Sequence, residues 1–269
     1  INEGGAIKDR WVAFVGGGYW HSTTLKNNAA ANAPSIIITD NTGFAPSGTQ
    51  TLSIGTESGI TYTNTSATTI FGIPTSGAGR ITTSHTAGEV VTYSPIGRGF
   101  HVIDIKLGKV IWSWEPSTDN NMRYPVTAAP AAVDINSDGR VNYVYVVDTG
   151  NQLWRFNVGT AGTFDNTTGN ERITGGWTAT RIFSPKLPSI PQRSFNKVDV
   201  AFDKGFNAWV FFGTGDREKP EDPGTGRIYA IRDDGSSPSA PYNEVDNLVS
   251  LTSVIANADN TVTGTITAS

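Results

Sequence analysis

The chain of 269 residues contains no cysteine, which excludes a disulfide scaffold and every metal site built on thiolates. Its only histidines, His21, His85 and His101, follow no spacing that is typical of a metal site. Charged residues make up only 16% and the formal net charge is −4, whereas nucleic-acid binding requires a basic face. No apolar run approaches the length of a membrane-spanning segment.

Glycine, threonine and aromatic residues are abundant instead, with 30 glycines and seven tryptophans. This composition is typical of an all-β protein with many turns, built as one β domain or two smaller ones. The sequence begins at Ile1 without a signal peptide, which predicts a piece of a longer chain.

Three segments share one plan: an apolar strand, a glycine-rich turn, and a second strand of small, aromatic and hydrophobic residues. This plan is typical of β-propeller blades, whose aromatic side chains pack between neighbouring sheets. The expected strands cover 11–15, 99–105 and 108–112, then 131–134, 143–147 and 152–157, then 198–202, 208–212 and 226–231. Because a ring needs about four to eight blades, we expect either divergent further blades or part of a larger ring, with residues 1–269 as the propeller region. A β-sandwich with similar hairpins is the alternative.

Residues 21–88 differ in composition, being rich in Thr, Ser, Ala, Gly and Asn and poor in charge. They separate the strands of the first blade, so we expect an insertion that projects from the propeller. Short strands are expected at 35–39 and 59–63. Two interpretations stay open for this insertion: a partner-binding region or tolerated decoration.

The stretch from Asp134 to Asn142 carries oxygen-bearing side chains at positions 1, 3, 5 and 9 and glycine at position 6. This is the spacing with which a short loop wraps one hard cation, and a ligand set of oxygens alone favours Ca²⁺. The expected ligands are Asp134, Asn136, Asp138, the carbonyl oxygen of Arg140, and Asn142.

The residues that flank this loop differ from those of an EF-hand. Position 12 is Tyr145 in place of a bidentate glutamate, and a β-branched and aromatic run follows in place of a helix. We therefore expect a calcium loop in a β protein, weakened by having only two carboxylates. An Asx-rich hairpin turn without an ion is the alternative. The mixed-charge loop 216–222 is expected to be a solvated hairpin tip, with a second ion site as its alternative.

Residues 131–156, which contain this loop and its flanking strands, closely resemble the calcium-loop blade of PilY1-type type IV pilus proteins. Residues 11–19 resemble the family's blade-opening strand, and 211–216 with 226–231 resemble a later blade. The matches follow the family's order and cover roughly 8–20 and 95–250, whereas the insertion matches nothing in the family.

The resemblance implies a C-terminal propeller domain at the pilus tip or cell surface, outside the cell. It implies roles in pilus biogenesis, adhesion and twitching motility, with calcium occupancy modulating pilus extension against retraction. The same five ligands are implied, although the family has aspartate where this chain has Asn142. The implied partners are minor pilins and the pilus tip complex, and host or abiotic surfaces, which the family contacts through an N-terminal region that is missing here.

Two other functions remain open. Residues 99–112 resemble the repeat of quinoprotein dehydrogenases, propellers in which a tryptophan at the position of Trp112 packs the blades together. Only one good copy is present and no catalytic constellation accompanies it, so we expect no enzyme. A generic calcium-stabilised adhesion domain unrelated to pili is the other alternative.

Overall fold

The computed structural model describes residues 1–19, 22–41, 44, 47–93, 97–186, 193–217, 220, 226–251, 255–256, 262–263 and 267–268. His21 and residues 218, 219, 221 and 222 of the mixed-charge loop lie outside the described residues. Every regular element of the described part is a β-strand, which confirms the predicted all-β class. None of the described residues belongs to a helix that is long and apolar enough to cross a lipid bilayer.

The chain divides into two compact units. The sheet unit comprises residues 1–15, 101–112 and 127–269, and the barrel unit comprises residues 16–100 and 113–126. Each unit has its own hydrophobic core, and the buried side chains of each core belong to that unit alone.

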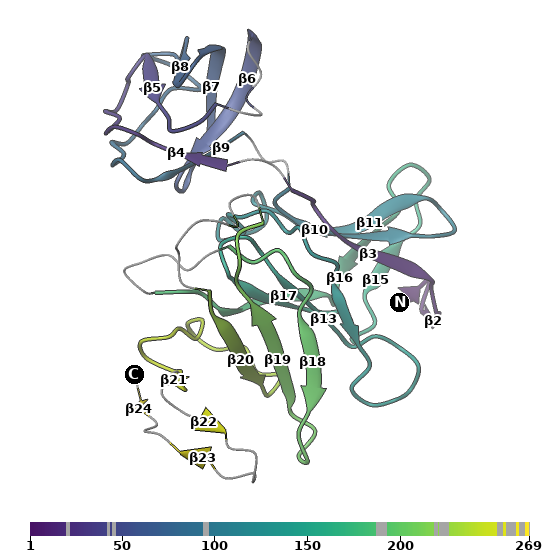
Figure 1. Cartoon of the computed structure of the whole chain (residues 1–269). Coiled ribbons are helices and arrows are strands. Elements are labelled where there is room, and N and C mark those ends of the chain that lie inside the picture. Colours follow the sequence, from purple (N-terminus) through teal and green to yellow (C-terminus); the bar gives the residue numbers. More distant parts are fainter. Residues whose placement is uncertain are drawn as a thin grey trace. The chain divides into compact units, whose positions relative to one another are not determined.

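Three sheets contain all the strands expected for the blades, within a few residues at each end (Figure 1). Sheet 1 has the order β11–β10–β3, sheet 2 the order β12–β13–β14–β17, and sheet 3 the order β18–β19–β20. Their bounds are β3 Val12–Gly16, β10 Phe100–Asp104, β11 Lys109–Trp114, β12 Ala131–Val133, β13 Tyr143–Val147, β14 Leu153–Asn157, β17 Thr178–Phe183, β18 Asp199–Phe202, β19 Ala208–Gly213 and β20 Ile228–Asp233. Sheets 2 and 3 are antiparallel throughout. The described strands form these sheets without closing a ring of blades.

Sheet 2 is covered on both faces, which explains why β13 and β14 consist almost entirely of buried residues. One face packs against sheet 3, where the ring of Phe183 lies 5.0 Å from that of Tyr229 and 5.9 Å from that of Phe212. On the other face, Phe156 contacts Trp112 of β11 with ring centroids 6.0 Å apart. Trp112 therefore has a packing role between sheets.

A buried ion pair also joins sheets 2 and 3. Nη1 of Arg155 lies 2.5 Å from Oδ1 of Asp233, and both side chains are only 3% exposed. The other oxygen of Asp233 accepts a hydrogen bond of 2.8 Å from the Tyr145 hydroxyl. Burial, followed by the charge of Asp233, raises the pKa of Tyr145 well above its ordinary value.

Shorter strands complete the sheet unit. A four-stranded sheet has the order β16–β15–β1–β2, and two pairs, β21–β24 and β22–β23, lie near the C-terminus. Their bounds are β1 Asn2–Glu3, β2 Ala6–Ile7, β15 Thr163–Asp165, β16 Arg172–Gly175, β21 Val249–Ser250, β22 Ile255–Ala256, β23 Val262–Thr263 and β24 Thr267–Ala268. Arg10 fixes the N-terminal hairpin by pairing with Glu3 and Asp104, while its guanidinium lies 4.0 Å from the ring centre of Phe164.

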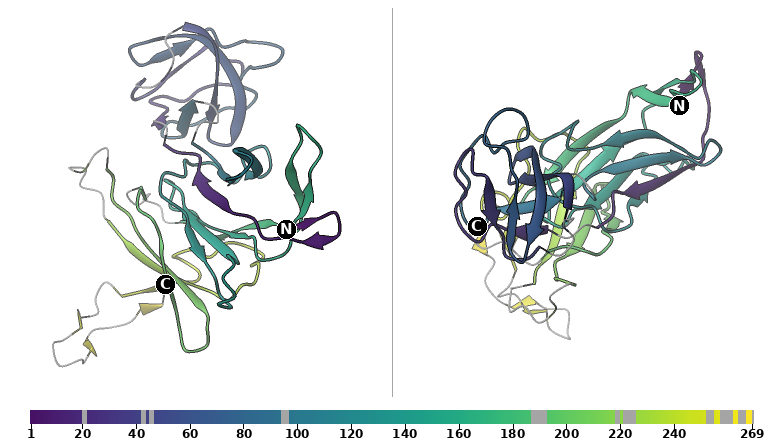
Figure 2. Two further views of the ribbon diagram at one scale, coloured as in Figure 1. Left: turned by 90° about the vertical axis from the view of Figure 1, so that its right-hand side faces the viewer. Right: turned by 90° about the horizontal axis from the view of Figure 1, so that it is seen from above.

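The barrel unit contains one six-stranded sheet of order β4–β9–β6–β7–β8–β5, seen from further sides in Figure 2. The bounds are β4 Ser22–Thr24, β5 Ser35–Ile37, β6 Ser47–Ile54, β7 Glu57–Ser66, β8 Thr69–Phe71 and β9 Val90–Tyr93. The edge strands β4 and β5 meet through a bridge between Leu25 and Ile38 and a bond of 2.8 Å from the Lys26 N–H to the Ile37 carbonyl. The sheet therefore curls around its own core.

Alternation along these strands explains the composition of residues 21–88. Ile60 and Tyr62 of β7 point into the core, while Thr61, Thr63 and Thr65 alternate onto the opposite face, where they are half-buried or exposed. The strand expected at 35–39 corresponds to β5, which ends at Ile37, and the strand expected at 59–63 lies within β7.

The first segment of the barrel unit, residues 16–100, begins and ends at neighbouring points. The Gly17 N–H donates to the Gly99 carbonyl over 2.8 Å. A side chain at residue 17 would place its Cβ 2.7 Å from the backbone of Gly97, so this crossing requires glycine.

Candidate metal centre

The predicted calcium loop connects β12 and β13 in sheet 2. Val133 pairs with Tyr143 in the antiparallel register, and the Asn142 N–H donates to the Val133 carbonyl over 2.9 Å. Residues 134–142 therefore leave one strand and enter the next at the same level of the sheet. Two well-packed strands hold both ends of the loop, while its middle is exposed.

The Asp134 carboxylate is the acceptor around which the loop turns. Its Oδ1 accepts from the N–H groups of Asn136 and Asp138, each over 3.3 Å, and its Oδ2 accepts from Gly139 over 2.7 Å. Positive φ angles of 59° at Ser137 and 83° at Gly139 make this reversal possible. The backbone is thus wrapped around the first predicted ligand.

Asn136 and Asp138 lie beside each other in the same loop. The amide Nδ2 of Asn136 donates to Oδ2 of Asp138 over 3.2 Å, and Oδ1 of Asp138 accepts from the Arg140 N–H over 2.8 Å. Three of the predicted ligand side chains, at positions 1, 3 and 5, are therefore brought together.

Asn142 closes the base of the loop. Its side-chain oxygen accepts from the Ile135 N–H over 2.8 Å, and its carbonyl accepts from Val158 and Gly159, each over 2.9 Å. A Cβ at residue 159 would lie 2.9 Å from the Asn142 Cα, so glycine permits this contact. Asn142 has a clear role in positioning the loop, and its role as a ligand stays a prediction.

The Arg140 side chain points to the N-terminal segment. Its Nε and Nη2 donate to the two oxygens of Asp9 over 2.7 and 3.2 Å, and its Nη1 lies 3.7 Å from Oδ2 of Asp138. The hydrogen bond from Arg140 holds the pKa of Asp9 below its ordinary value. Both side chains of the Arg140–Asp9 pair are largely exposed, so this pair contributes little to stability.

The donor set fits a hard cation in kind. Carboxylate, amide and main-chain oxygens are the ligands that Ca²⁺ prefers, and the loop offers no nitrogen or sulfur ligand. Across the part of the chain that the structure describes, no group of three or more His, Cys, Asp or Glu side chains is arranged to hold a metal. A calcium ion here would therefore depend on amide and carbonyl oxygens beside Asp134 and Asp138.

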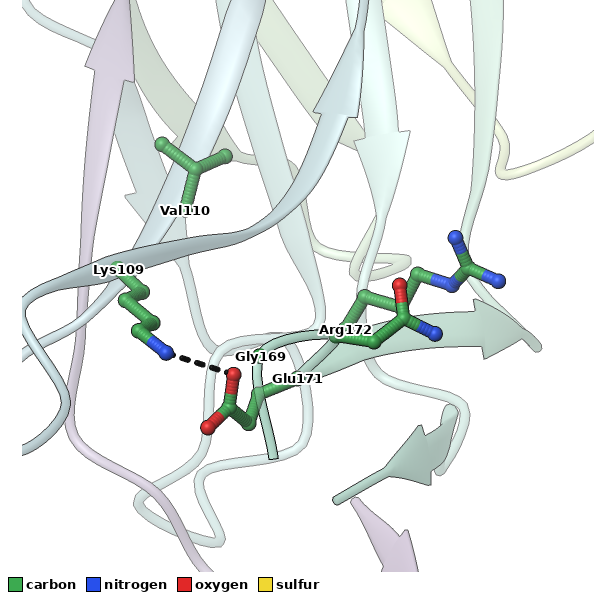
Figure 3. A pocket seen from close by; sticks show the side chains of 6 residues that line it. Lys109, Val110, Gly169, Glu171 and Arg172 are labelled. Atoms are coloured by element: carbon green, nitrogen blue, oxygen red, sulfur yellow. Dashed lines mark hydrogen bonds and ion pairs between the residues drawn. The ribbon is translucent and has the colours of Figure 1, made fainter. Parts of the chain in front are cut away.

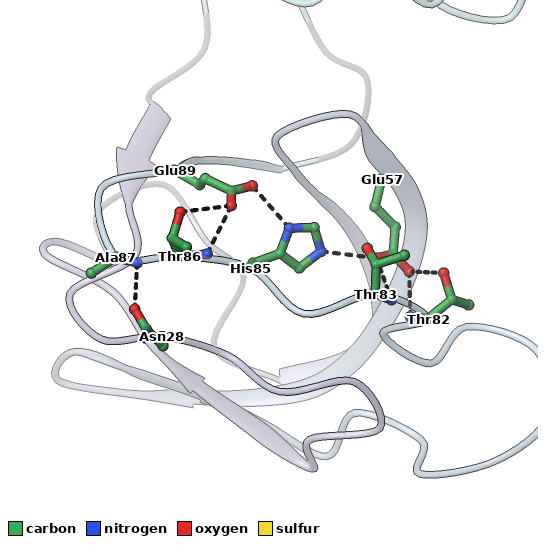
Figure 4. Close-up of polar contacts among 8 residues, drawn as sticks. All are labelled: Asn28, Glu57, Thr82, Thr83, His85, Thr86, Ala87 and Glu89. Carbon is green, nitrogen blue, oxygen red and sulfur yellow. Dashed lines mark hydrogen bonds and ion pairs between the residues drawn. The ribbon is translucent and has the colours of Figure 1, made fainter.

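A second polar cluster, in the barrel unit, was not anticipated from the sequence (Figure 4). The two ring nitrogens of His85 face carboxylates, Nε2 at 2.8 Å from Glu57 and Nδ1 at 2.9 Å from Glu89. Glu57 also accepts from the backbone and hydroxyl groups of Thr82 and Thr83, over 2.5 to 3.2 Å. Burial alone would raise the pKa of Glu57, but these hydrogen bonds outweigh it and lower the pKa to about 2.

This cluster is suited to holding the barrel together. It joins Glu57, the first residue of β7, the loop of residues 82–86, and Glu89, which immediately precedes β9. Because both imidazole nitrogens contact carboxylates, neither faces an open site in which it could bind a metal or act as a base. His101 lies half-buried in β10.

The structure also contains a shallow pocket of about 390 Å³ between the start of β11 and the start of β16 (Figure 3). It is lined by Lys109, Val110, Gly169, Asn170, Glu171 and Arg172. Nζ of Lys109 lies 2.8 Å from Oε2 of Glu171, and this hydrogen bond lowers the pKa of Glu171. Because the ammonium already has a carboxylate partner, the pocket provides no argument for a bound anion.

No protein-family model matches this sequence, and no curated protein matches it. Among solved structures, the chain is similar to the PilY1 C-terminal domain of Pseudomonas aeruginosa, with a TM-score of 0.43 and 19% sequence identity. The match covers 56% of this chain and 35% of the solved chain, so this chain spans about a third of the length of that structure. A similarity of this size does not establish a family.

Proposed function

We propose that this chain is a calcium-binding region of a β-propeller in a type IV pilus-associated protein, and not an enzyme. It would support pilus biogenesis, adhesion and twitching motility at the cell surface or pilus tip, where minor pilins are the expected partners. The sequence resemblance of residues 131–156 and of the strands on either side of them supports the pilus assignment.

One observation carries the calcium proposal: the loop 134–142 turns around Asp134 and brings Asn136 and Asp138 to its side. Held between β12 and β13, these oxygens would form the ligand set with the Arg140 carbonyl and Asn142. Bound Ca²⁺ would neutralise the two carboxylates and fix the loop. Because binding would occur to the folded state, it would raise the stability of the protein by mass action.

The regulatory part of the proposal concerns the same loop. The loop is exposed, anchored at its two ends, and linked to Asp9 through the exposed side chain of Arg140, so its conformation can respond to an ion without changing sheet 2. A partner that contacts residues 135–140 would then distinguish the calcium-bound from the calcium-free loop. In this way occupancy would modulate pilus extension against retraction.

Calcium titration by calorimetry on chelator-treated protein tests the site. We expect saturable binding of one ion that is lost in Asp138→Ala. Asp234→Ala is the matched control, because Asp234 also precedes a glycine in an exposed turn and accepts from Ser236 over 2.9 Å. Binding that persists in Asp138→Ala, or none in the intact protein, would contradict the proposed site.

The pilus assignment requires a separate test in cells that carry the full-length protein. We expect Asp138→Ala to change twitching motility or the amount of surface pili, while Asp234→Ala changes neither. If calcium binds as proposed but Asp138→Ala cells behave as wild type, the domain would be a calcium-stabilised adhesion module without a regulatory loop.

A further inference from the structure

The Arg140 guanidinium lies between a carboxylate of the proposed calcium loop and a carboxylate of the N-terminal segment. Its Nη1 is 3.7 Å from Oδ2 of Asp138, while its Nε and Nη2 donate to the two oxygens of Asp9 over 2.7 and 3.2 Å. The contact with Asp9 has two hydrogen bonds and is the shorter one, so Asp9 is the principal partner of this cation. The same charge acts on Asp138 from a longer distance.

A cation beside Asp138 competes with a bound calcium ion. Oδ1 of Asp138 accepts from the Arg140 N–H over 2.8 Å, and Oδ2 accepts from the Asn136 amide over 3.2 Å. The guanidinium approaches Oδ2, an oxygen that the proposed site offers to the ion. A unit charge at about 4 Å changes the affinity for an ion about fivefold even in water. The distance between Arg140 and Asp138 therefore influences calcium affinity.

Asp9 extends from a backbone that is fixed on both sides. The Lys8 N–H donates to the Ile1 carbonyl over 2.8 Å, which closes the β1–β2 hairpin directly before Asp9. The next residue, Arg10, pairs with Asp104 of β10. The Asp9 carboxylate can therefore restrain the long side chain that it contacts, and it links the N-terminal hairpin to the loop between β12 and β13.

We propose that Asp9 sets the calcium affinity of the loop by holding the Arg140 guanidinium away from Asp138. This role of Asp9 presupposes the calcium site proposed above and adds a means of regulating it. Coupling between two binding events is reciprocal, so calcium that neutralises Asp138 also favours the pairing of Arg140 with Asp9. The ion would thereby hold the N-terminal hairpin to the loop, and a contact that occupies Asp9 would weaken calcium binding.

Calorimetric calcium titrations of the intact chain, Asp9→Asn, Arg140→Gln and the double variant test this role. Asp9→Asn should weaken calcium binding about three- to tenfold, because it releases the guanidinium toward Asp138. Arg140→Gln keeps the main-chain carbonyl and should tighten binding by a similar factor. Once Arg140 is replaced, Asp9→Asn should have no further effect, because Asp9 acts through Arg140.

Glu3→Gln is the matched control for Asp9→Asn. It also removes one carboxylate from the N-terminal segment, but the cationic partners of Glu3 are Lys8 and Arg10. We expect this variant to bind calcium with the affinity of the intact chain. The effect of Asp9→Asn should also shrink at about 1 M salt, because both side chains of the Asp9–Arg140 pair are exposed and therefore screened.

Hydrogen exchange provides a readout of the reciprocal effect. Calcium should slow the exchange of amides in the β1–β2 hairpin of the intact chain. The same amides should not respond to calcium in Arg140→Gln, which lacks the link to the loop. Circular dichroism checks that each variant is folded.

The outcomes distinguish the role of Asp9 from the calcium site itself. If the intact chain binds no calcium, both proposals fail. Saturable binding with equal affinity in the intact chain and in Asp9→Asn would overturn the role of Asp9 alone. So would an effect of Asp9→Asn that remains undiminished when Arg140 is glutamine.

Discussion

Replacing Glu57 with glutamine tests whether the Glu57–His85–Glu89 cluster stabilises the barrel unit. The pKa of Glu57 falls from 4.5 to about 2 in the folded chain, and its side chain is only 12% exposed. At 1.36 kcal/mol per pKa unit, this shift corresponds to about 3 kcal/mol of stability at neutral pH. Glu57→Gln removes the charge and turns an amide toward groups that donate hydrogen bonds, so most of this contribution should be lost.

The sign of the pH dependence follows from the lowered pKa. The unfolded chain binds a proton at Glu57 near pH 4.5, whereas the folded barrel resists protonation until about pH 2. The stabilisation is therefore complete above pH 4.5 and is lost as the pH falls toward 2. In Glu57→Gln this part of the acid dependence should disappear.

Hydrogen exchange followed by mass spectrometry can locate the effect within the intact chain. Amides of β7 and β9 should exchange roughly a hundredfold faster in Glu57→Gln at pH 7, because the barrel of the variant is expected to be about 3 kcal/mol less stable than that of the wild type. Amides of sheets 2 and 3 provide the internal reference, and Glu171→Gln, which removes a carboxylate of the sheet unit, is the control. A change below threefold in β7 and β9, or an unchanged acid dependence, would refute the assigned role of Glu57.

Three further predictions concern other parts of the chain. Asp233→Ala should destabilise the sheet unit by about 3–5 kcal/mol in urea denaturation, because it leaves Arg155 buried without its carboxylate; a loss below 1 kcal/mol would contradict this. Gly72→Ala should destabilise the barrel by about 1–3 kcal/mol or more. The φ angle of Gly72 is +76°, and the new Cβ would lie 1.9 Å from Thr63 Oγ1. A thermal midpoint equal to wild type would show that the barrel adapts. Asn142→Asp should tighten calcium binding severalfold in calorimetry, because it adds a charge and keeps an acceptor for Ile135; unchanged affinity would exclude position 9 as a ligand.

Features with a local signal could be predicted from the sequence. β13 coincides with residues 143–147, because a run of valines and tyrosines is both apolar and β-favouring. The wrapping of the loop around Asp134 was also predictable, since oxygen-bearing side chains two residues apart and a glycine at position 139 act within one turn. The closed propeller remains a proposal, since the described strands form separate sheets.

Contacts between distant residues could not be predicted in this way. Glu57 and His85 are 28 residues apart and meet because the loop that follows residue 81 returns to the start of β7, where Thr82 and Thr83 also bond to Glu57. Arg155 and Asp233 are 78 residues apart, and their pairing depends on how sheet 3 packs on sheet 2. Nothing in the sequence near either residue distinguishes a buried, paired charge from a solvated one.

The hydrogen bond between Gly17 and Gly99 has a consequence for how this chain can change in evolution. The strands that lead into and out of the barrel, β3 and β10, are neighbours in sheet 1. The 81 residues between these two glycines therefore begin and end at adjacent points of the structure. Replacing these residues with a four-residue turn would lower the entropic free-energy cost of closing the loop by only about 3 kcal/mol, because this cost grows with the logarithm of loop length. The position can therefore exchange one folded insert for another while the register between β3 and β10 stays the same.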